Sequence, residues 1–466
     1  MNTTQLRQKI LDLAICGKLV PQDPNDEPVV VIGDNSNNLP FEIPETWSAP
    51  ILSEICDIVT GSTPSKQNKS YYGNEYPFYK PTDLDNCYNV FSAEDMLSSK
   101  GFEVSRKLPA NTVLVTCIGA TIGKTGIIRN VGCSNQQINA ILPKRHILAE
   151  FIYFICISDF FQEQIHNNAS ATTLPILNKG KMGKLIFLLP PLAEQHRIVA
   201  AIESTFTVID EIERNKAELQ AAVTAAKQKI LSLAIQGKLV PQDPNDVPAA
   251  ILLKQIKSTK MLSGKPKNII VHSDITKYIL KDLPNNWAVC RLSEIGKIVG
   301  GGTPSTANEN YWLDGNISWI TPADLSGYSA KYISKGNRNI TVAGLLESSA
   351  VLMPANSVLF SSRAPIGYCM IAKNEVCTNQ GFKSIVPYVD CMSEYIYYFL
   401  KAQTEEIRCR ASGTTFKEIS SAEFGKTIIA LPPLAEQKRI VSAIEAAFVQ
   451  LDKILVNLNK TVLQEQ

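Results

Sequence analysis

The stretch KILDLAICGKLVPQDPNDEP, residues 9–28, returns as KILSLAIQGKLVPQDPNDVP at residues 229–248, with 17 of the 20 positions identical. Internal repeats are sought first in any sequence, because a missed repeat leads to the wrong fold. A copy this close, 220 residues further along the chain, predicts a protein built from two similar units.

A second repeated segment closes each unit. Residues 189–206 read LPPLAEQHRIVAAIESTF and residues 431–448 read LPPLAEQKRIVSAIEAAF, with 14 of 18 positions identical. We therefore expect two variable globular units of about 150 residues, each followed by a nearly invariant segment. Between these segments the similarity is looser but stays in order: Trp47 matches Trp287, GSTPS at 61–65 matches GGTPS at 301–305, Ile122-Gly123 matches Ile366-Gly367, and Asn135-Gln136 matches Asn379-Gln380.

Residues 191–236 are predicted to form one long helix between the units. Proline is tolerated at a helix start, as at Pro191, and Gly237 is a typical stop. Apolar residues recur every three or four positions, which is the pattern of a coiled-coil seam. They are Val199, Ile202, Phe206, Ile209, Leu219, Val223, Ala226, Ile230 and Leu233, and in the C-terminal copy Val441, Ile444, Phe448, Leu451, Leu455, Leu458 and Val462.

The two ends of the chain complement each other. In register with the central helix, Gln466 falls on Thr224 and Gln5 falls on Ala225, so the two terminal segments together rebuild that helix without a gap. We therefore expect a circular arrangement in which the chain ends meet and form a second helical rod beside the first. At 1.5 Å per residue, 46 residues make a rod about 70 Å long.

The composition is that of an ordinary globular chain. Of 466 residues, 45% are hydrophobic and 19% are charged, which argues against a disordered or fibrous protein. The net charge is only +2, so no overall basicity points to nucleic acid. The longest apolar run, 151–157, is far shorter than the ~20 residues of a membrane span, and the N-terminus lacks the apolar core of a signal peptide. Eleven scattered cysteines and four distant histidines argue against a metal site and favour reduced thiols in a cytoplasmic protein.

One motif suggests catalysis but fails on inspection. IGATIGKTG at 118–126 resembles a phosphate-binding loop, yet only three residues separate Gly119 from Gly123 where that loop needs four. TVLVTCIG before it and GIIR after it predict strand, turn and strand, without the helix that a phosphate loop opens. No methyltransferase tetrapeptide or G-x-G cofactor loop is found. The sequence therefore favours a binding protein over an enzyme.

Two unlike units on paired helices, related by a pseudo-two-fold axis, suit a partner with two sites at a fixed separation. Duplex DNA is one such partner, because half-sites about one turn (~34 Å) apart mirror the two-fold symmetry of a protein. A coiled-coil scaffold with two protein-interaction domains is the alternative, and architecture alone does not choose between them. An enzyme with an unrecognised site, such as a divergent nuclease, is a third.

Local charge favours DNA only slightly. Residues 40–190 hold 13 basic and 13 acidic side chains, whereas residues 250–430 hold 20 and 14. Five lysines and no acid lie in 249–273. We expect an exposed flexible linker there, with a phosphate-binding arm as the alternative.

Five short motifs in the second unit carry a resemblance to a known family. GGTPS, NYW, IGY, NQGFK and SGTTF follow one another at 301–305, 310–312, 366–368, 379–383 and 412–416. With the two LPPLAEQ segments and the repeated GKLVPQDP, the whole chain resembles the specificity (S) subunit of a Type I restriction-modification enzyme. The first unit departs from the pattern, with TIGKT in place of PIGYC and NQQIN in place of NQGFK.

The resemblance implies an α/β (mixed α+β) protein with two target recognition domains, separated by a pair of long antiparallel helices in a pseudo-two-fold circular arrangement. Each domain reads one half of a bipartite, asymmetric double-stranded DNA site, and the helices fix the spacer. The implied segments are an N-terminal helix at 1–20, recognition domain 1 at 21–190, the central helix at 191–240, recognition domain 2 at 241–430 and a C-terminal helix at 431–466.

The resemblance also implies the partners. The subunit itself has no active site, metal or cofactor. It binds two modification subunits, which carry S-adenosylmethionine for adenine-N6 methylation, and two restriction subunits that depend on ATP and Mg.

Base-reading residues are expected to be long polar side chains in matched loops whose identities differ between the units. Residues repeated in both units, such as Thr63 and Asn135, are expected to fix loops or contact phosphates, and the pairs Tyr71-Tyr72 and Tyr311-Trp312 are expected mainly in the core. The DNA-binding candidates are Lys66, Gln67, Asn68, Lys80 and Lys124 in the first unit, and Asn308, Tyr311, Arg363 and Lys417 in the second. The partner-binding candidates, on outward faces of the repeated segments, are Glu194, Gln195, Arg197, Glu436, Gln437 and Arg439.

Overall fold

The computed structural model describes residues 2–31, 33–85, 88–144, 146–170, 174–261, 283–413 and 417–461. They form two compact units, the first containing the chain up to Ala217 and the second containing Glu218–Asn459. The division falls inside the long helix that the sequence sets apart as a segment of its own at 191–240. One part of that helix therefore packs with each unit.

The predicted central helix is present as α7, Leu192–Ile235, a single helix of 44 residues and about 66 Å. It begins directly after Pro191 and is followed by Gly237, which has a φ of +69°. The Lys238 N–H donates to the Leu233 carbonyl at 2.9 Å, so glycine closes the helix as the sequence predicts. No helix in the described part of the chain is both long and apolar enough to cross a membrane.

The first unit is a mixed α+β domain. Its five-stranded sheet has the order β1-β8-β5-β6-β3, antiparallel except that β3 and β6 run parallel, and a second sheet has the order β4-β2-β7. Besides α7, its elements are α1 (Thr3–Ile15), η1 (Ser36–Asn38), α2 (Leu52–Ile55), β1 (Cys56–Thr60), η2 (Lys69–Tyr71), β2 (Tyr72–Tyr79), η3 (Pro81–Leu84), β3 (Asn89–Val90), β4 (Met96–Leu97), α3 (Ser99–Glu103), β5 (Thr112–Thr116), β6 (Thr125–Ile128), β7 (Cys133–Ser134), β8 (Ile138–Pro143), α4 (Ala149–Ile157), α5 (Asp159–Asn168) and α6 (Lys179–Met182).

The second unit repeats this topology strand for strand. Its five-stranded sheet has the order β10-β17-β14-β15-β12, again with one parallel pair, β12 and β15, and its second sheet has the order β13-β11-β16. A two-stranded pair, β18-β9, is added. Its elements are α8 (Ala249–Met261), β9 (Ala288–Arg291), α10 (Leu292–Ile295), β10 (Gly296–Gly300), η4 (Glu309–Tyr311), β11 (Ile317–Ile320), η5 (Pro322–Leu325), β12 (Tyr332–Ile333), β13 (Arg338–Ile340), α11 (Val342–Leu346), β14 (Val358–Ser362), β15 (Ile366–Ala372), β16 (Cys377–Thr378), β17 (Lys383–Pro387), η6 (Asp390–Met392), α12 (Ser393–Ala402), α13 (Thr404–Cys409), α14 (Ser421–Gly425), β18 (Ile428–Leu431) and α15 (Leu434–Thr461).

The matching topology confirms the prediction of two similar units. It also confirms the interpretation of 112–128 as strand, turn and strand, because β5 and β6 pair in antiparallel register. No helix follows that turn, and the phosphate-loop interpretation is excluded by the fold as well as by the spacing.

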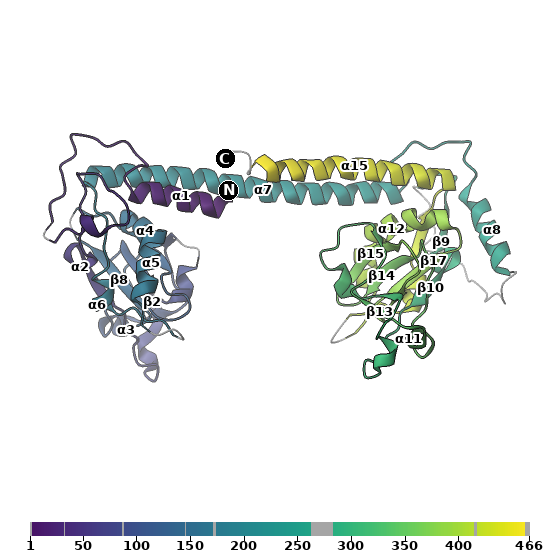
Figure 1. The fold of residues 1–466 in the computed structure, drawn as a ribbon, viewed down its shortest axis with the longest axis horizontal. Helices are drawn as coiled ribbons and strands as arrows, with labels where there is room; N and C mark the ends of the chain where they lie inside the picture. The colour runs from purple at the N-terminus through teal and green to yellow at the C-terminus, as the bar shows by residue number, and fades with distance from the viewer. Residues whose placement is uncertain are drawn as a thin grey trace. The chain divides into compact units, whose positions relative to one another are not determined.

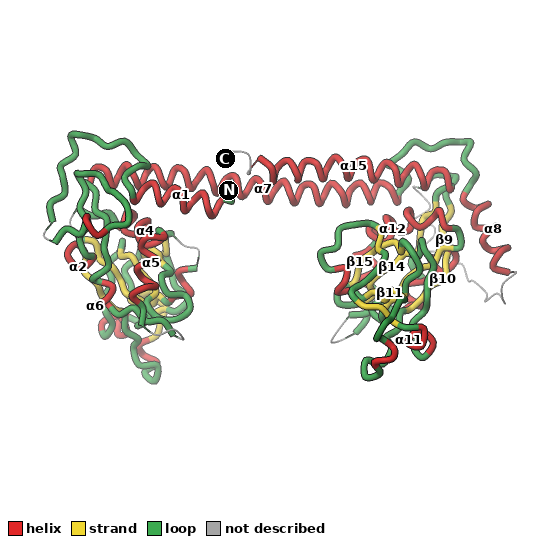
Figure 2. The backbone as a smooth tube through the Cα atoms, viewed as in Figure 1, coloured by secondary structure: helices red, strands yellow, loops and turns green. Residues whose placement is uncertain are grey.

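Within each unit a helix lies between the large sheet and the long helices. In the first unit α4 packs on β5 and β6 and also contacts α1, and Phe154 of α4 meets Phe206 of α7 edge to face. In the second unit α12 packs on β14 and β15, and its Tyr398 meets Phe448 of α15 in the same way. Figure 2 shows the strands of each unit grouped apart from its long helices. In each unit one apolar cluster thus extends from the large sheet to the helix pair.

The N-terminal helix pairs with the first part of α7. Arg7 of α1 lies 2.5 Å from Asp210, whereas Gln22, beyond the end of α1, contacts Glu194, so the two helices run antiparallel (Figure 1). The facing apolar residues belong to one buried cluster, which includes Ile10, Leu11, Ala14, Ile198, Ile202 and Ile209.

The C-terminal helix α15 pairs with the last part of α7 in the same sense. Lys227 lies 2.5 Å from Asp452, and Gln242, beyond α7, contacts Glu436. In this part of α7 the seam differs slightly from the prediction, because Leu231 is buried where Leu233 is only half-buried. The predicted meeting of the chain ends joins Gln5 to Gln466. Gln5 lies in α1, but residues 462–466 lie outside the described residues, so the meeting stays a prediction.

The expected flexible linker after residue 249 is wrong for its first half. Residues 249–261 form the helix α8, whose Ala249 and Ile256 are buried in the core of the second unit. Apolar side chains at helical spacing explain the difference, since they give the lysine-rich run a face that packs. Of its five lysines, Lys265 and Lys267 lie outside the described residues.

Candidate functional sites

In each unit the two repeated segments meet the start of the variable fold at a polar junction. In the first unit the junction consists of Gly17, Gln22, Asp26, Trp47, Glu194 and Arg197. In the first unit α1 ends at Ile15, and Gly17 follows with a φ of +65°. The Lys18 N–H donates to the Leu13 carbonyl at 2.8 Å, which closes the helix through a glycine in the left-handed region. A Cβ at Gly17 would lie 2.4 Å from Cγ of Pro44, so this close approach requires glycine.

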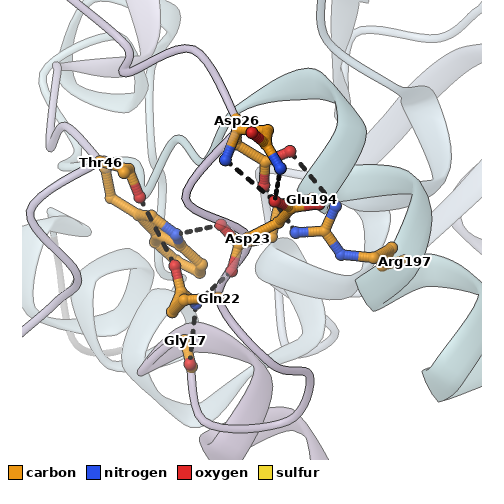
Figure 3. Close-up of polar contacts among 9 residues, drawn as sticks. Gly17, Gln22, Asp23, Asp26, Thr46, Glu194 and Arg197 are labelled. Carbon is orange, nitrogen blue, oxygen red and sulfur yellow. Dashed lines mark hydrogen bonds and ion pairs between the residues drawn. The ribbon is translucent and has the colours of Figure 1, made fainter.

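Glu194, in the first turn of α7, is fully buried at this junction. Its carboxylate accepts a hydrogen bond from Nε1 of Trp47 at 2.8 Å and another from Nε2 of Gln22 at 2.5 Å. Gln22 in turn donates to the Gly17 carbonyl at 3.1 Å, and Figure 3 shows this chain of contacts. One carboxylate thus connects α7, the segment after α1 and the start of the recognition fold.

Arg197, one turn further along α7, adds an ion pair to the junction. Its guanidinium contacts Asp26 through two hydrogen bonds, of 2.6 and 3.3 Å, in the bidentate geometry that gives such pairs their strength (Figure 3). The bond to Asp26 raises the pKa of Arg197. The Asp26 side chain is only 6% exposed, so this ion pair is largely buried and not a solvent-exposed surface pair.

The second unit contains the same junction with every partner conserved in kind. Nε1 of Trp287 donates to Glu436 at 3.0 Å, and Nε2 of Gln242 donates to the same carboxylate at 2.6 Å. Arg439 contacts Asp246 at 2.6 Å. The near-identity of the repeated segments therefore has a structural cause: they build the same polar junction twice.

Burial is the largest influence on both glutamates. It raises the pKa of Glu194, against the lowering effect of the hydrogen bonds from Trp47 and Gln22. Burial likewise raises the pKa of Glu436, against the hydrogen bonds from Gln242 and Trp287. Each carboxylate is held in a low-dielectric site and depends on its donors for compensation.

The prediction that these residues face outward is wrong for four of the six. Glu194, Gln195, Glu436 and Gln437 are at most 1% exposed. Gln195 accepts the Leu148 N–H at 3.0 Å and donates to the Pro190 carbonyl, so it caps neighbouring backbone. A helix taken alone gives no sign of the domain that covers its first turn, and only Arg197 and Arg439 stay partly exposed.

The DNA-binding candidates of the first unit fall into two groups. Lys66, Gln67 and Asn68 are exposed in the loop before η2, where Oδ1 of Asn68 accepts the Ser70 N–H at 3.1 Å. Lys80 and Lys124 are instead engaged within the unit, since Lys80 pairs with Asp95 and Lys124 pairs with Asp85. Their role with DNA stays a prediction.

In the second unit Asn308 and Tyr311 lie in the loop that corresponds to the first group. Asn308 caps η4 by accepting the Asn310 N–H, and Tyr311 is half-buried. Arg363 lies 3.7 Å from Glu418, and Lys417, the residue before Glu418, is exposed.

The aromatic pairs support the repeated TPS loops. The Tyr72 hydroxyl donates to the Pro64 carbonyl at 2.8 Å, and Nε1 of Trp312 donates to the Ser305 carbonyl at 3.0 Å. Both rings pack partly buried against apolar clusters of their units. Tyr72 and Trp312 thus pack at the edge of a core cluster and not inside it, and Tyr71 and Tyr311 are also only half-buried, so the prediction that these pairs lie in the core holds only in part.

Sequence reasoning missed one matched pair of side chains beside these loops. Thr63 donates its hydroxyl to Oε1 of Gln136 at 2.5 Å, and Thr303 does the same to Gln380. Both glutamines are exposed. The signal was present in the repeated Asn-Gln dipeptide, whose asparagine the sequence assigns to fixing a loop or contacting a phosphate.

The family model described as "Type I restriction modification DNA specificity domain" matches residues 44–221 and 284–465, well over half of the chain. The chain belongs to this family. The two matches each contain one recognition fold and one LPPLAEQ helix, which is the division that the repeats predict.

Curated relatives match either one part or the whole length. The chain is 42% identical over 164 residues to the Type I restriction enzyme MjaIX specificity subunit of Methanocaldococcus jannaschii, which is 35% of this chain and 38% of that protein. It is 31% identical over 172 residues to the HindI specificity subunit of Haemophilus influenzae, again with only 37% of that protein covered. The EcoAI specificity subunit of Escherichia coli is 24% identical, with 98% of this chain and 89% of that protein covered.

Two solved structures share the fold of this specificity-family chain. One comes from work on complex assembly and conformational transition of the type I R-M system, with a TM-score of 0.63, 21% identity, and 91% of this chain and 95% of that chain covered. The other is the crystal structure of the HsdS subunit from Thermoanaerobacter tengcongensis, with a TM-score of 0.52, 20% identity and coverages of 91% and 93%. At these identities the likeness shows the fold alone.

The junction of this specificity-family protein can be tested by charge reversal. Arg197→Glu places a third carboxylate beside Asp26 and Glu194, and we expect it to lower the free energy of unfolding by about 1–3 kcal/mol. Urea denaturation of the full chain measures this. Asp26→Arg combined with Arg197→Glu restores the opposite charges and should recover most of the loss. If the single variant unfolds like the wild type, the ion pair contributes nothing to the junction.

Proposed function

We propose that the chain is the DNA-binding specificity subunit of a Type I restriction-modification complex. Each recognition unit reads one half of a bipartite, asymmetric site, and the helix pairs set the spacer between the halves. One observation carries this proposal: the two units share topology and junction, while the side chains on their exposed loops differ. Two units that share a fold but differ in their loop side chains suit a DNA site whose two halves differ in sequence.

The partners proposed for this chain are two modification subunits, which supply S-adenosylmethionine, and two restriction subunits, which use ATP and Mg. The chain itself has a binding role, without catalysis or a cofactor of its own, in the cytoplasm. Two identical partners need two equivalent surfaces. Ile212 of α7 and Ile454 of α15 occupy matched positions and are 46% and 44% exposed, which supports docking on these helix faces in place of the buried glutamates.

Methylation sequencing of the host genome, with the gene present and deleted, tests this function. We expect deletion to remove one bipartite N6-methyladenine motif completely while other motifs persist. The same data supply both half-sites and the spacer. A methylome that is unchanged, together with failure of the chain to purify with a methyltransferase, would contradict the proposal and favour a protein-binding scaffold.

A further inference from the structure

Gln136 and Gln380 occupy the tip of the same tight turn in the two units. In the first unit Oδ1 of Asn135 accepts the Gln137 N–H at 3.1 Å, and in the second Oδ1 of Asn379 accepts the Gly381 N–H at 2.9 Å. In each turn the asparagine side chain accepts a hydrogen bond from the residue two positions later, so the glutamine between these two residues lies at the tip of the turn. The glutamine is therefore the residue that each turn presents.

The turn is held from below by the backbone. The Asn135 N–H donates to the Tyr79 carbonyl at 3.1 Å, and the Asn379 N–H donates to the Ile320 carbonyl at 3.0 Å. Each acceptor is the last residue of the middle strand, β2 or β11, of the three-stranded sheet, so the bond fastens the turn to that sheet. Neither glutamine thus sits on a loose loop.

The turn is also held from the side by the GSTPS or GGTPS loop. A Cβ at Gly61 would lie 2.1 Å from the Asn135 carbonyl oxygen, and a Cβ at Gly301 would lie 1.8 Å from that of Asn379. Only glycine permits this approach of two backbones. The same close contact, built twice, brings Thr63 and Thr303 within reach of the glutamines.

The threonine hydroxyls fix the direction of both glutamines. Each glutamine accepts this hydrogen bond at Oε1. Among the described residues its Nε2 amino group has no partner, and the second lone pair of Oε1 can accept another bond. An exposed glutamine that serves solubility alone gains nothing from being oriented, because ordering a long side chain costs conformational entropy. A paired donor and acceptor, fixed in advance, is instead the form that recognises a flat polar edge.

The surroundings of the two glutamines differ. At one bridge in the first unit Ile118 lies opposite Ile176, next to a hollow of about 400 Å³ that Gln136 also lines. At the matching bridge in the second unit Arg363 lies opposite Glu418. A shared reader thus has an apolar neighbour in one unit and a charged one in the other.

We propose that Gln136 and Gln380 each bind the major-groove edge of an adenine, one in each half-site, through Nε2 and Oε1. Adenine offers the N7 acceptor and N6 donor that this pair complements. The side chains at the neighbouring bridges, Ile118 and Ile176 in one unit and Arg363 and Glu418 in the other, then select different bases in the two half-sites. This inference rests on the proposed function and adds to it the residues that the two units use in common.

The test uses the full chain purified with its methyltransferase and competition binding on duplexes in which each base pair of the two half-sites is changed in turn. Gln136→Ala should weaken binding to the cognate duplex roughly 10- to 100-fold and remove discrimination at one adenine of one half-site only. Gln380→Ala should do the same in the other half-site. Gln380→Glu should shift preference at that position toward cytosine, whose N4 group is a donor.

Matched controls separate reading from folding. Asn374→Ala changes an exposed amide on the turn between β15 and β16 and should leave binding unchanged. Thr303→Val keeps Gln380 but removes the hydrogen bond that orients it. The loss of discrimination at the same adenine should therefore be smaller than in Gln380→Ala.

Two results overturn the inference alone. A loss that is equal at every base pair, with a weaker salt dependence, assigns the glutamines to phosphates. Unchanged binding by both alanine variants removes them from the interface. If the wild-type complex itself prefers no bipartite duplex, the proposed function fails instead.

Discussion

A four-residue insertion in α7 between Arg214 and Leu219 is expected to lengthen the DNA spacer while leaving both half-sites unchanged. Four residues add about 6 Å of helix, close to the rise of two base pairs, and turn the helix by only about 40° beyond a full turn. Arg7 of α1 forms ion pairs with α7 as far as Glu213, and Lys227 of α7 forms one with Asp452 of α15. The insertion lies between these two sets of ion pairs, and a four-residue insertion is one that a helix pair tolerates as a stutter.

Methylation sequencing of a host that carries this variant measures the effect. The original motif should disappear and a motif with the same halves and a spacer about two base pairs longer should replace it. A two-residue insertion is the matched control, because it rotates the helix by about 200° and should abolish methylation of any bipartite motif. A changed half-site with an unchanged spacer would refute a helical ruler.

The largest loss of stability is expected from Glu194→Ala or Glu436→Ala. Either change leaves an indole N–H and a glutamine amide without their buried acceptor, at about 1–3 kcal/mol for each unmet donor. The free energy of unfolding in urea at pH 7 should fall by several kcal/mol in sum. Glu211→Ala removes an exposed carboxylate from the same helix and should stay within about 0.5 kcal/mol of the wild type.

The pH dependence of the same junction has a definite sign. Because burial raises the pKa of both Glu194 and Glu436, the folded chain favours their protonated forms. The part of the stability that depends on protonation of these two carboxyls is complete below the ordinary glutamate pKa of 4.5 and is lost as pH rises through the raised values. The double variant Glu194→Gln with Glu436→Gln should lack this decline above pH 4.5. A decline of the same size in both proteins would assign it to other groups.

Features written in local sequence are predicted well. The length of α7, its glycine stop and the pairing of β5 with β6 follow from periodicity and turn chemistry, which act over a few residues. The alternation of two variable units with two constant segments follows from the repeats alone.

Features that depend on distant contacts are not. Trp47 lies 147 positions before Glu194, so the sequence of the helix does not reveal that its first turn is covered. Lys124 is predicted to contact DNA but forms an ion pair with Asp85, 39 positions earlier in the chain. The helix α8 is missed because its packing surface belongs to the rest of the second unit. In each case tertiary burial decides what local pattern leaves open.

The duplicated junction makes the recognition fold an exchangeable part. The variable folds contribute Trp47 and Trp287 to the two junctions. Gln22, Glu194 and their counterparts come from the constant segments. A foreign recognition fold with a tryptophan at this place meets the same acceptor in either position. We therefore expect that exchanging a whole variable fold between two such chains would change the exposed loops and leave the residues of the junction in place.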